Sequence, residues 1–246
     1  MITKTFDNNS PALISPQNPT EKVKCDAIIA TFSYQIEAFV VEKYNPTQVG
    51  QFRCVNGFTP IYTFNHKGKT YGFYKTLLGA PASAGILEDV LPIFDCDKIV
   101  VFGSAGTLDK NCYGKVVAPT HAYRDEGTSY HYQEAESFIT LPNASKVASI
   151  LRESGINVVE GKCWTTDAFY RETKNNIEKR KAEGCIVVDM ECSALQAVCN
   201  WRGKDLHYIL FSGDLLDAPE WTEEGLAEAN HAYQNFHIAL HLAERI

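Results

Sequence analysis

Short apolar runs alternate with helix-like segments along most of the chain. Strand-like runs rich in apolar and β-branched residues occupy 27–31, 98–102, 115–119, 158–164, 186–189 and 206–211, and residues 60–64 and 70–77 have the pattern of a hairpin. Helix-like segments occupy 35–44, 82–94, 143–154, 173–183, 223–245 and the stretch after Glu191. This alternation predicts an α/β fold, a single domain with three α/β/α layers around a mixed central sheet.

The first residues of the chain have a different pattern. Residues 1–22 contain Pro11, Pro16 and Pro19 among polar residues and lack the apolar core of a signal peptide. They predict an irregular N-terminal arm, and residues 23–246 predict the α/β domain. A chain of 246 residues is long enough for one such domain with a substantial core.

Charge and composition argue against several classes of function. A net charge of -7 and a pI of about 5.5 give no reason to expect nucleic acid or an anionic membrane as a partner. No apolar run approaches the roughly 18 residues that span a bilayer. Eight cysteines without a C-x-x-C pair favour free thiols, so we expect a cytoplasmic protein. His237 and His241 fit a solvated helix face better than a metal site, and no metal is expected.

Two strand-like runs end in acidic residues. The run 186–189 leads into Asp189, Met190 and Glu191, and two carboxylates around a methionine suit a site better than a core. The run 206–211 leads into Asp214, 23 positions after Glu191. Ligands of open α/β sheets bind at the carboxyl ends of strands. An acid that opens a helix also acts as an N-cap or dipole partner, so for Asp189 or Asp214 alone both interpretations stay open.

Three other segments have compositions that suit ligand binding. The small residues 103–107 would let backbone N–H groups approach an anion or a sugar, although a tight turn has the same composition. The loop 124–132 collects polar and aromatic side chains that fit a pocket or an interface. Phe169 and Tyr170, just past the run 158–164, fit either stacking on a planar base or core packing at a helix start.

Together these segments resemble the nucleoside phosphorylase superfamily of purine nucleoside phosphorylases, uridine phosphorylases and methylthioadenosine/adenosylhomocysteine nucleosidases. The similarity extends from about Cys25 to the C-terminus, and the order of motifs carries it. Residues 103–106 resemble the phosphate-side loop, 169–170 the base-stacking segment, and 188–191 the ribose-binding signature with Asp for its first Glu. Asp214 falls where purine-cleaving members carry the acid that protonates the base.

The resemblance implies an unusual set of phosphate ligands. Phosphorylases usually carry cations at two positions that hold Tyr34 and Val101 in this chain. Arg53 resembles an arginine that family members lend to a neighbouring subunit, and the loop 124–132 resembles one found in uridine phosphorylase-like members. The resemblance therefore leads us to expect phosphate at Gly103, Ser104, Arg53, Arg124 and Arg171.

The resemblance also implies cleavage of an N-glycosidic bond. Glu191 is expected to bind the ribose hydroxyls, with Met190 packed against the sugar. Phe169 is expected to stack on the base, and Asp214 to donate a proton to a purine N7 as the catalytic acid. The expected protein is a phosphorylase of purine nucleosides, or of uridine, that forms a homodimer or homohexamer and uses phosphate as co-substrate without a cofactor. A nucleoside hydrolase and a binding protein without turnover are the alternatives.

Overall fold

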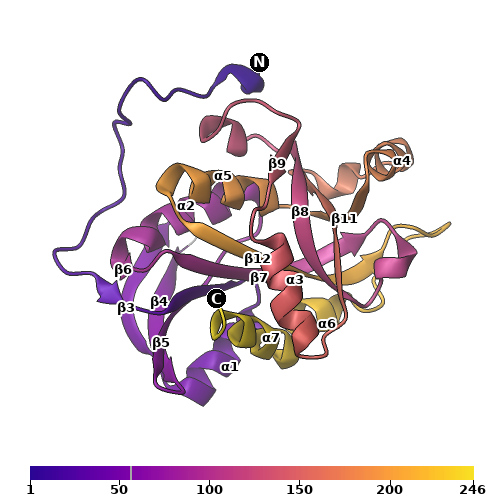
Figure 1. The fold of residues 1–246 in the computed structure, drawn as a ribbon. Helices are drawn as coiled ribbons and strands as arrows, with labels where there is room; N and C mark the ends of the chain where they lie inside the picture. The colour runs from indigo at the N-terminus through magenta and orange to yellow at the C-terminus, as the bar shows by residue number, and fades with distance from the viewer. Residues whose placement is uncertain (56) are drawn as a thin grey trace.

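The computed structural model describes residues 1–55 and 57–246 (Figure 1). The main helices are α1 (Tyr34–Tyr44), α2 (Ala80–Val90), α3 (Ala144–Glu153), α4 (Lys174–Ala182), α5 (Cys192–Arg202), α6 (Leu226–His231) and α7 (Tyr233–Ala243). The strands are β1 (Val23–Lys24), β2 (Ala27–Thr31), β3 (Thr47–Cys54), β4 (Gly57–His66), β5 (Lys69–Lys75), β6 (Phe94–Asp95), β7 (Lys98–Thr107), β8 (Val116–Asp125), β9 (Phe138–Thr140), β10 (Val158–Thr166), β11 (Cys185–Asp189) and β12 (Asp205–Leu215).

Ten of these strands form one mixed sheet. Their order is β11-β10-β8-β12-β7-β2-β5-β4-β3, with β9 paired to β8, while β1 and β6 pair separately. β11 also pairs antiparallel with β7, where Val187 faces Thr107 and Val188 faces Gly106. This second pairing closes five strands into a ring, and β2, β5, β4 and β3 continue from it as an open sheet. The closure brings the carboxyl ends of β7 and β11 together.

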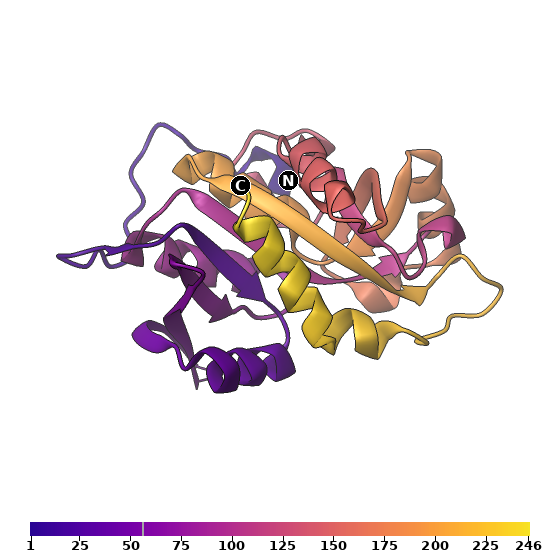
Figure 2. The same ribbon diagram turned by 60° about the horizontal axis from the view of Figure 1, so that its bottom comes forward.

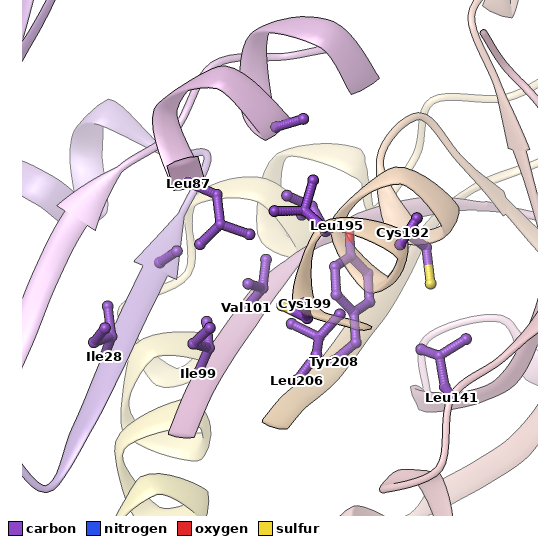
Figure 3. Packing of buried hydrophobic residues seen from close by; sticks show 14 of the residues in the cluster. Ile28, Leu87, Ile99, Val101, Leu141, Cys192, Leu195, Cys199, Leu206 and Tyr208 are labelled. Atoms are coloured by element: carbon purple, nitrogen blue, oxygen red, sulfur yellow. The ribbon is translucent and has the colours of Figure 1, made fainter. Parts of the chain in front are cut away.

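Helices cover both faces of the sheet, as alternate residues of β7 show. Ile99 and Val101 belong to the core under α2 and α5. Figure 3 shows these two side chains together with Leu195 of α5. Val100 and Phe102 belong to the opposite core, under α1, α3 and α7. Figure 2 shows α7 crossing the sheet on that side. The predicted α/β fold with helices on both sides of a mixed central sheet is confirmed.

Local signals set the helix ends that border the sheet. Ser33 caps α1, because its Oγ accepts a hydrogen bond from the backbone N–H of Ile36 at 3.2 Å. Gly79 precedes α2 with a φ of 94°, a conformation that side chains with a Cβ rarely adopt. Gly203 ends α5 in the left-handed conformation. These residues fix where the chain leaves β2 and β5 and where α5 stops.

The prediction of one helix over 223–245 is wrong. Ala232, with φ -62° and ψ 124°, is extended and separates α6 from α7. The side-chain amide of Asn235 donates to the backbone oxygens of Glu228 and Ala229, each at 2.9 Å. These bonds satisfy carbonyl groups that the break leaves without helical partners. Because they come from a polar side chain, the spacing of apolar residues did not reveal the break.

Several strands are longer than the apolar runs that predicted them. β7 extends through residues 103–107, which the sequence placed after the strand, and β12 extends past Asp214. β3 was not predicted, because its residues are mostly half-buried or exposed and show no apolar run. The small-residue segment therefore continues the strand β7, and Asp214 lies within β12, where the pairing with β7 shifts register.

The N-terminal segment lies along the surface of the domain. After a short 3-10 turn at residues 2–4, residues 5–22 contain no helix or strand. Phe6 meets Trp201 edge to face, with ring centroids 6.1 Å apart. Within residues 1–55 and 57–246, every helix is too short or too polar to cross a membrane.

Removal of the aromatic ring of Phe236 should have a large effect on the stability of the fold. Phe236 is fully buried, and its ring contacts several aromatic rings from α1 and three strands. Phe236→Ala should lower the free energy of unfolding by about 3–5 kcal/mol, because it leaves a cavity in this core. Urea denaturation measures the loss. Val41→Ala, at an exposed position of α1, is the control and should change stability far less.

Candidate active site

Asp189 is a buried carboxylate at the junction of three elements. Its Oδ1 accepts hydrogen bonds from Thr165 Oγ1 at 2.8 Å and Cys163 Sγ at 3.3 Å, both in β10. Its Oδ2 accepts from Tyr208 Oη of β12 at 3.1 Å and from the N–H of Cys192 at 2.8 Å. Burial raises the pKa of Asp189, and these donors oppose the rise. Asp189 thus joins β10, β12 and α5 around the end of β11.

Glu191 lies two residues further on and is also buried, with 5% of its surface exposed. Its Oε1 accepts a hydrogen bond from the N–H of Gly79 at 2.5 Å, in the turn between β5 and α2. Burial, and secondly the charge of Asp189, raise the pKa of Glu191 to about 8. Met190, between the two acids, is half-buried. The end of β11 therefore presents an acid that bulk water scarcely reaches.

Asp214 lies in β12 beside a shift in the pairing of β12 with β7. Its Oδ2 accepts a hydrogen bond from Trp221 Nε1 at 2.9 Å. A Cβ added to Gly106 of β7 would lie 3.5 Å from Asp214 Oδ1, so the carboxylate stands over the end of that strand. Because Gly106 pairs with Val188, Asp214 and the end of β11 are neighbours.

The aromatic pair after β10 lies near Asp214. Phe169 and Tyr170 form a 3-10 turn and are 46% and 88% exposed, with ring centroids 4.1 Å apart. Glu172 follows them, and its pKa is raised to about 8, chiefly by burial and secondly by the charge of Asp214. That repulsion means that the two carboxyl groups are close. The turn that carries the aromatic pair therefore brings Glu172 within reach of the charge of Asp214.

Gly103 and Ser104, the expected phosphate-side residues, lie in β7 beside β2 and α6. The ring of Phe32 lies so close to Gly103 that an added Cβ would be 2.8 Å from its Cδ2. Only glycine lets this ring rest against the strand. Ser104 Oγ donates a hydrogen bond to Asn230 Oδ1 of α6 at 2.7 Å. Helix α6 is thereby joined to the end of β7.

A second contact joins α6 to the end of β2. Nδ1 of His231 and Oγ of Ser33 are hydrogen-bonded at 2.7 Å. The imidazole ring also meets the ring of Tyr34 edge to face, with centroids 5.4 Å apart. Two consecutive side chains of α6 therefore hold the carboxyl ends of two neighbouring strands.

Arg124 does not have the free guanidinium expected of a phosphate ligand. Its Nε donates to Ser129 Oγ at 2.8 Å, and its two Nη atoms donate to the carbonyl oxygens of Glu134 at 2.5 Å and Gln133 at 3.0 Å. The guanidinium also lies 4.2 Å from the ring centroid of Tyr130. Arg124 is buried in its own loop, so, contrary to the expectation, its guanidinium is not open to phosphate.

Arg53 and Arg171 are exposed. Arg53 lies near the end of β3 opposite Phe58 of β4, and Arg171 ends the 3-10 turn that carries the aromatic pair. Among the described residues, neither arginine hydrogen-bonds to Gly103 or Ser104. The chain by itself therefore brings Glu191, Asp214 and the aromatic segment together but adds no arginine to its phosphate side.

Sequence reasoning missed several residues of this region: Ser33, Glu172, Trp221, Asn230 and His231. Glu172 comes two residues after the predicted base-stacking pair, so its position was a usable signal. The two α6 residues fell inside an expected continuous helix and carried no such signal. Within the described part of the chain, no three His, Cys, Asp or Glu side chains are grouped to hold a metal ion.

Comparisons with known proteins place this chain in a family. The model of the phosphorylase superfamily matches residues 26–243, and the chain belongs to that superfamily. It is 26% identical to a purine nucleoside phosphorylase of Bacillus subtilis over 213 residues, which cover 82% of this chain and 87% of that one. It is 29% identical to an uncharacterised protein of Acanthamoeba polyphaga mimivirus over 166 residues, 66% of this chain and 65% of that one.

A solved structure supports the fold. The crystal structure of an AMP nucleosidase from Bacteroides thetaiotaomicron matches with a TM-score of 0.70 at 18% identity, covering 89% of this chain and 87% of that one. The curated relatives thus include purine nucleoside phosphorylases, and the structural neighbour is a nucleosidase by name. The chain has the superfamily's fold and the general activity class of an enzyme that acts on nucleosides.

Glu191→Gln should abolish most activity without unfolding the protein. Loss of a charged hydrogen-bonding group at a substrate should reduce kcat/KM by roughly 100- to 1000-fold. Steady-state assays on the variant, with folding checked by circular dichroism, measure the effect. Glu160→Gln, on the partly exposed ion pair with Arg152, is the control. A folded Glu191→Gln protein with wild-type kcat/KM would contradict the assignment.

The same variant should change how stability depends on pH. Because the folded-state pKa of Glu191 is raised from 4.5 to about 8, the folded state holds an extra proton in that range. Wild-type stability should therefore fall as pH rises from about 4.5 to about 8. Glu172 acts in the same direction, so Glu191→Gln should weaken this fall without removing it. Urea midpoints across that range would show it; identical slopes would refute a buried, protonated Glu191.

Proposed function

We propose that the protein is a nucleoside phosphorylase that cleaves the N-glycosidic bond of a purine nucleoside with phosphate. The observation that carries this proposal is the buried acid Glu191, neighboured by Asp214 where β7, β11 and β12 meet. Glu191 suits the hydroxyl groups of a sugar, and Asp214 suits a base. The relatives named purine nucleoside phosphorylases match over most of their length and support the proposal.

Glu191 and Met190 are the residues proposed to bind the ribose. Cleavage of the bond builds positive charge on the sugar, and the site must meet that charge as it develops. Glu191 would accept hydrogen bonds from the 2′- and 3′-hydroxyls, and these donors favour its ionised form on binding. Met190 would pack against the apolar face of the ribose. The N–H of Gly79 already holds one oxygen of Glu191 and so orients the other.

The base half falls to Asp214, Glu172 and Phe169. The departing purine gains negative charge, and a proton at N7 neutralises it. With a pKa raised to about 8, Glu172 carries a proton at neutral pH beside Asp214. The two acids would together supply the proton, Asp214 at the base and Glu172 behind it. Phe169, half exposed, would stack on the purine.

Phosphate is the proposed acceptor, with Ser104 and Gly103 at its site and no cofactor. A specific observation favours a second candidate, a nucleoside hydrolase. Arg124 is committed to its own loop, and neither Arg53 nor Arg171 contacts Ser104 in the described chain. A phosphate near charge -2 needs compensating donors in a partly dry site, whereas water does not.

One assay decides between these candidates. Inosine, adenosine and uridine are incubated with the protein with and without phosphate, and the sugar products are identified. The phosphorylase predicts ribose 1-phosphate, purine preferred, and a collapse of turnover when phosphate is removed. Free ribose released at the same rate in phosphate-free buffer would establish the hydrolase, and binding without any product would establish a binding protein.

We propose further that the protein is a homo-oligomer, a dimer or a hexamer, in which Arg53 reaches the phosphate site of a second copy. Arg53 stands near the tip of the β3–β4 hairpin, where Val55 is fully exposed and Phe58 is 69% exposed. Exposed apolar side chains at a hairpin tip favour contact with another chain.

Arg53→Ala should raise the KM for phosphate by roughly 10-fold, because it removes one charged donor, and should change the KM for nucleoside less. Kinetics with each substrate varied in turn measure this, and light scattering at assay concentration gives the oligomeric state. Lys43→Ala, on the exposed side of α1, is the control. A fully active monomer would rule the proposal out.

Asp214→Asn should harm purine nucleosides far more than pyrimidine nucleosides, because only purines have an N7 to protonate. We expect kcat on inosine to fall by about 100-fold or more and kcat on uridine to fall much less. Asp217→Asn, at a half-buried ion pair with Lys181, serves as the control. Equal losses on both substrates would reduce Asp214 to a structural partner of Trp221.

A further inference from the structure

Four polar side chains meet at the carboxyl ends of β2 and β7. Ser104 Oγ donates to Asn230 Oδ1, and Ser33 Oγ is hydrogen-bonded to His231 Nδ1, both at 2.7 Å. Thr31 and Phe102 are register partners, so the two serines extend neighbouring strands. These four side chains therefore border the side of the site that the proposed function gives to phosphate.

The imidazole of His231 is the ionisable group of this cluster. Among the described residues, no Lys or Arg hydrogen-bonds to any of its four members. His231 is half-buried, so one ring nitrogen is tied to Ser33 while the ring keeps access to solvent. Imidazole serves in proteins both as a hydrogen-bond donor to anions and as a proton acceptor. This combination suits an acceptor site to which the chain itself adds no arginine.

The hydrogen bond between Ser33 and His231 can take either direction, so each side chain can be the donor. Ser33 Oγ accepts from the N–H of Ile36, so its one hydroxyl hydrogen can point to His231 Nδ1 when the ring is neutral. When the ring is protonated, Nδ1–H becomes the donor to Ser33 Oγ. The hydroxyl hydrogen of Ser33 is then free to turn toward an anion.

We propose that His231 binds the phosphate co-substrate and accepts a proton from it, an inference that rests on the proposed phosphorylase activity. Dihydrogen phosphate passes one proton to the neutral ring, which gives hydrogen phosphate and an imidazolium without a change in total charge. A phosphate oxygen then forms the bond to C1′ of the ribose. The C1′–N bond breaks with its electron pair on the base, which takes its proton from the acid pair at Asp214.

Asn230 decides whether the hydroxyl group of Ser104 is free to donate a hydrogen bond to an anion. In the structure the Ser104 hydroxyl donates to the carboxamide oxygen of Asn230, which leaves it no hydrogen for an anion. A turn of the amide would present Nδ2 to Ser104 Oγ and release that hydrogen. The carboxylate of Asn230→Asp has no N–H to present to Ser104 and adds a negative charge. This variant should therefore weaken phosphate binding.

The chain offers a matched control for the loss of an imidazole. His241 of α7 is hydrogen-bonded through Nε2 to Ser154 Oγ, so it forms a second Ser–His pair. That pair lies toward the C-terminal end of α7, which leads to Ile246 beside Lys98 at the start of β7. It therefore lies at the opposite end of the sheet from Ser33 and Ser104.

The experiment compares His231→Gln, Asn230→Asp and His241→Gln with the wild type. Steady-state kinetics vary phosphate at saturating inosine and then inosine at saturating phosphate. His231→Gln should raise the KM for phosphate about 10- to 100-fold, the worth of a charge-assisted hydrogen bond, and change the KM for inosine by less than about threefold. His241→Gln should leave both values unchanged. Calorimetric titration with inorganic phosphate alone should show the same loss of affinity, and circular dichroism checks folding.

The outcomes separate this inference from the proposed function. If the wild type forms ribose 1-phosphate and His231→Gln keeps a wild-type KM for phosphate, His231 is not a ligand and the inference falls alone. If wild-type turnover is independent of phosphate, the proposed function falls. In that case the proton transfer from a co-substrate falls with it, and calorimetry decides the binding part of the inference: a phosphate affinity lost in His231→Gln supports His231 as a phosphate ligand, and an equal or absent affinity in both proteins overturns it.

Discussion

The buried carboxylate of Asp189 is the constraint on which the site depends. A carboxylate without solvent is costly, and Asp189 is retained because donors from β10, β12 and α5 surround it. Those donors are satisfied only when β11 lies between β10 and β7 with its end at the start of α5. The position of Glu191, two residues later, follows from this geometry. Its negative neighbour is also one reason why Glu191 holds a proton at neutral pH.

The site divides into halves that different parts of the chain supply. The closed ring of strands supplies the acids at the ends of β11 and β12, together with the aromatic turn after β10. The open sheet and α6 supply the hydroxyl, amide and imidazole groups at the ends of β2 and β7. Residues of β7 belong to both halves, since Ser104 faces α6 and Gly106 lies under Asp214. β7 therefore sets the spacing between Asp214, proposed to serve the base, and the proposed acceptor side at Ser104.

The alternation of apolar runs and helices was enough to predict the fold class, because buried strands and amphipathic helices leave strong local patterns. Acids at strand ends identified Glu191 and Asp214 as candidates, since such positions stand out against an apolar run. Closure of the ring through Val188 and Gly106 left no local pattern, because pairing between distant strands is decided by packing. The same holds for Arg124, whose loop supplies the carbonyl groups that engage it, and for His231, which the break at Ala232 turns toward Ser33.

The single extended residue between α6 and α7 has an energetic consequence. α7 buries Phe236 and its neighbours in the core, whereas the described contacts of α6 include one buried apolar residue, Ala229. Loss of the contacts of α6 would therefore expose less apolar surface, and cost less, than loss of the contacts of α7. The proposed contacts to the acceptor and the main apolar core are thus carried by two separate helices.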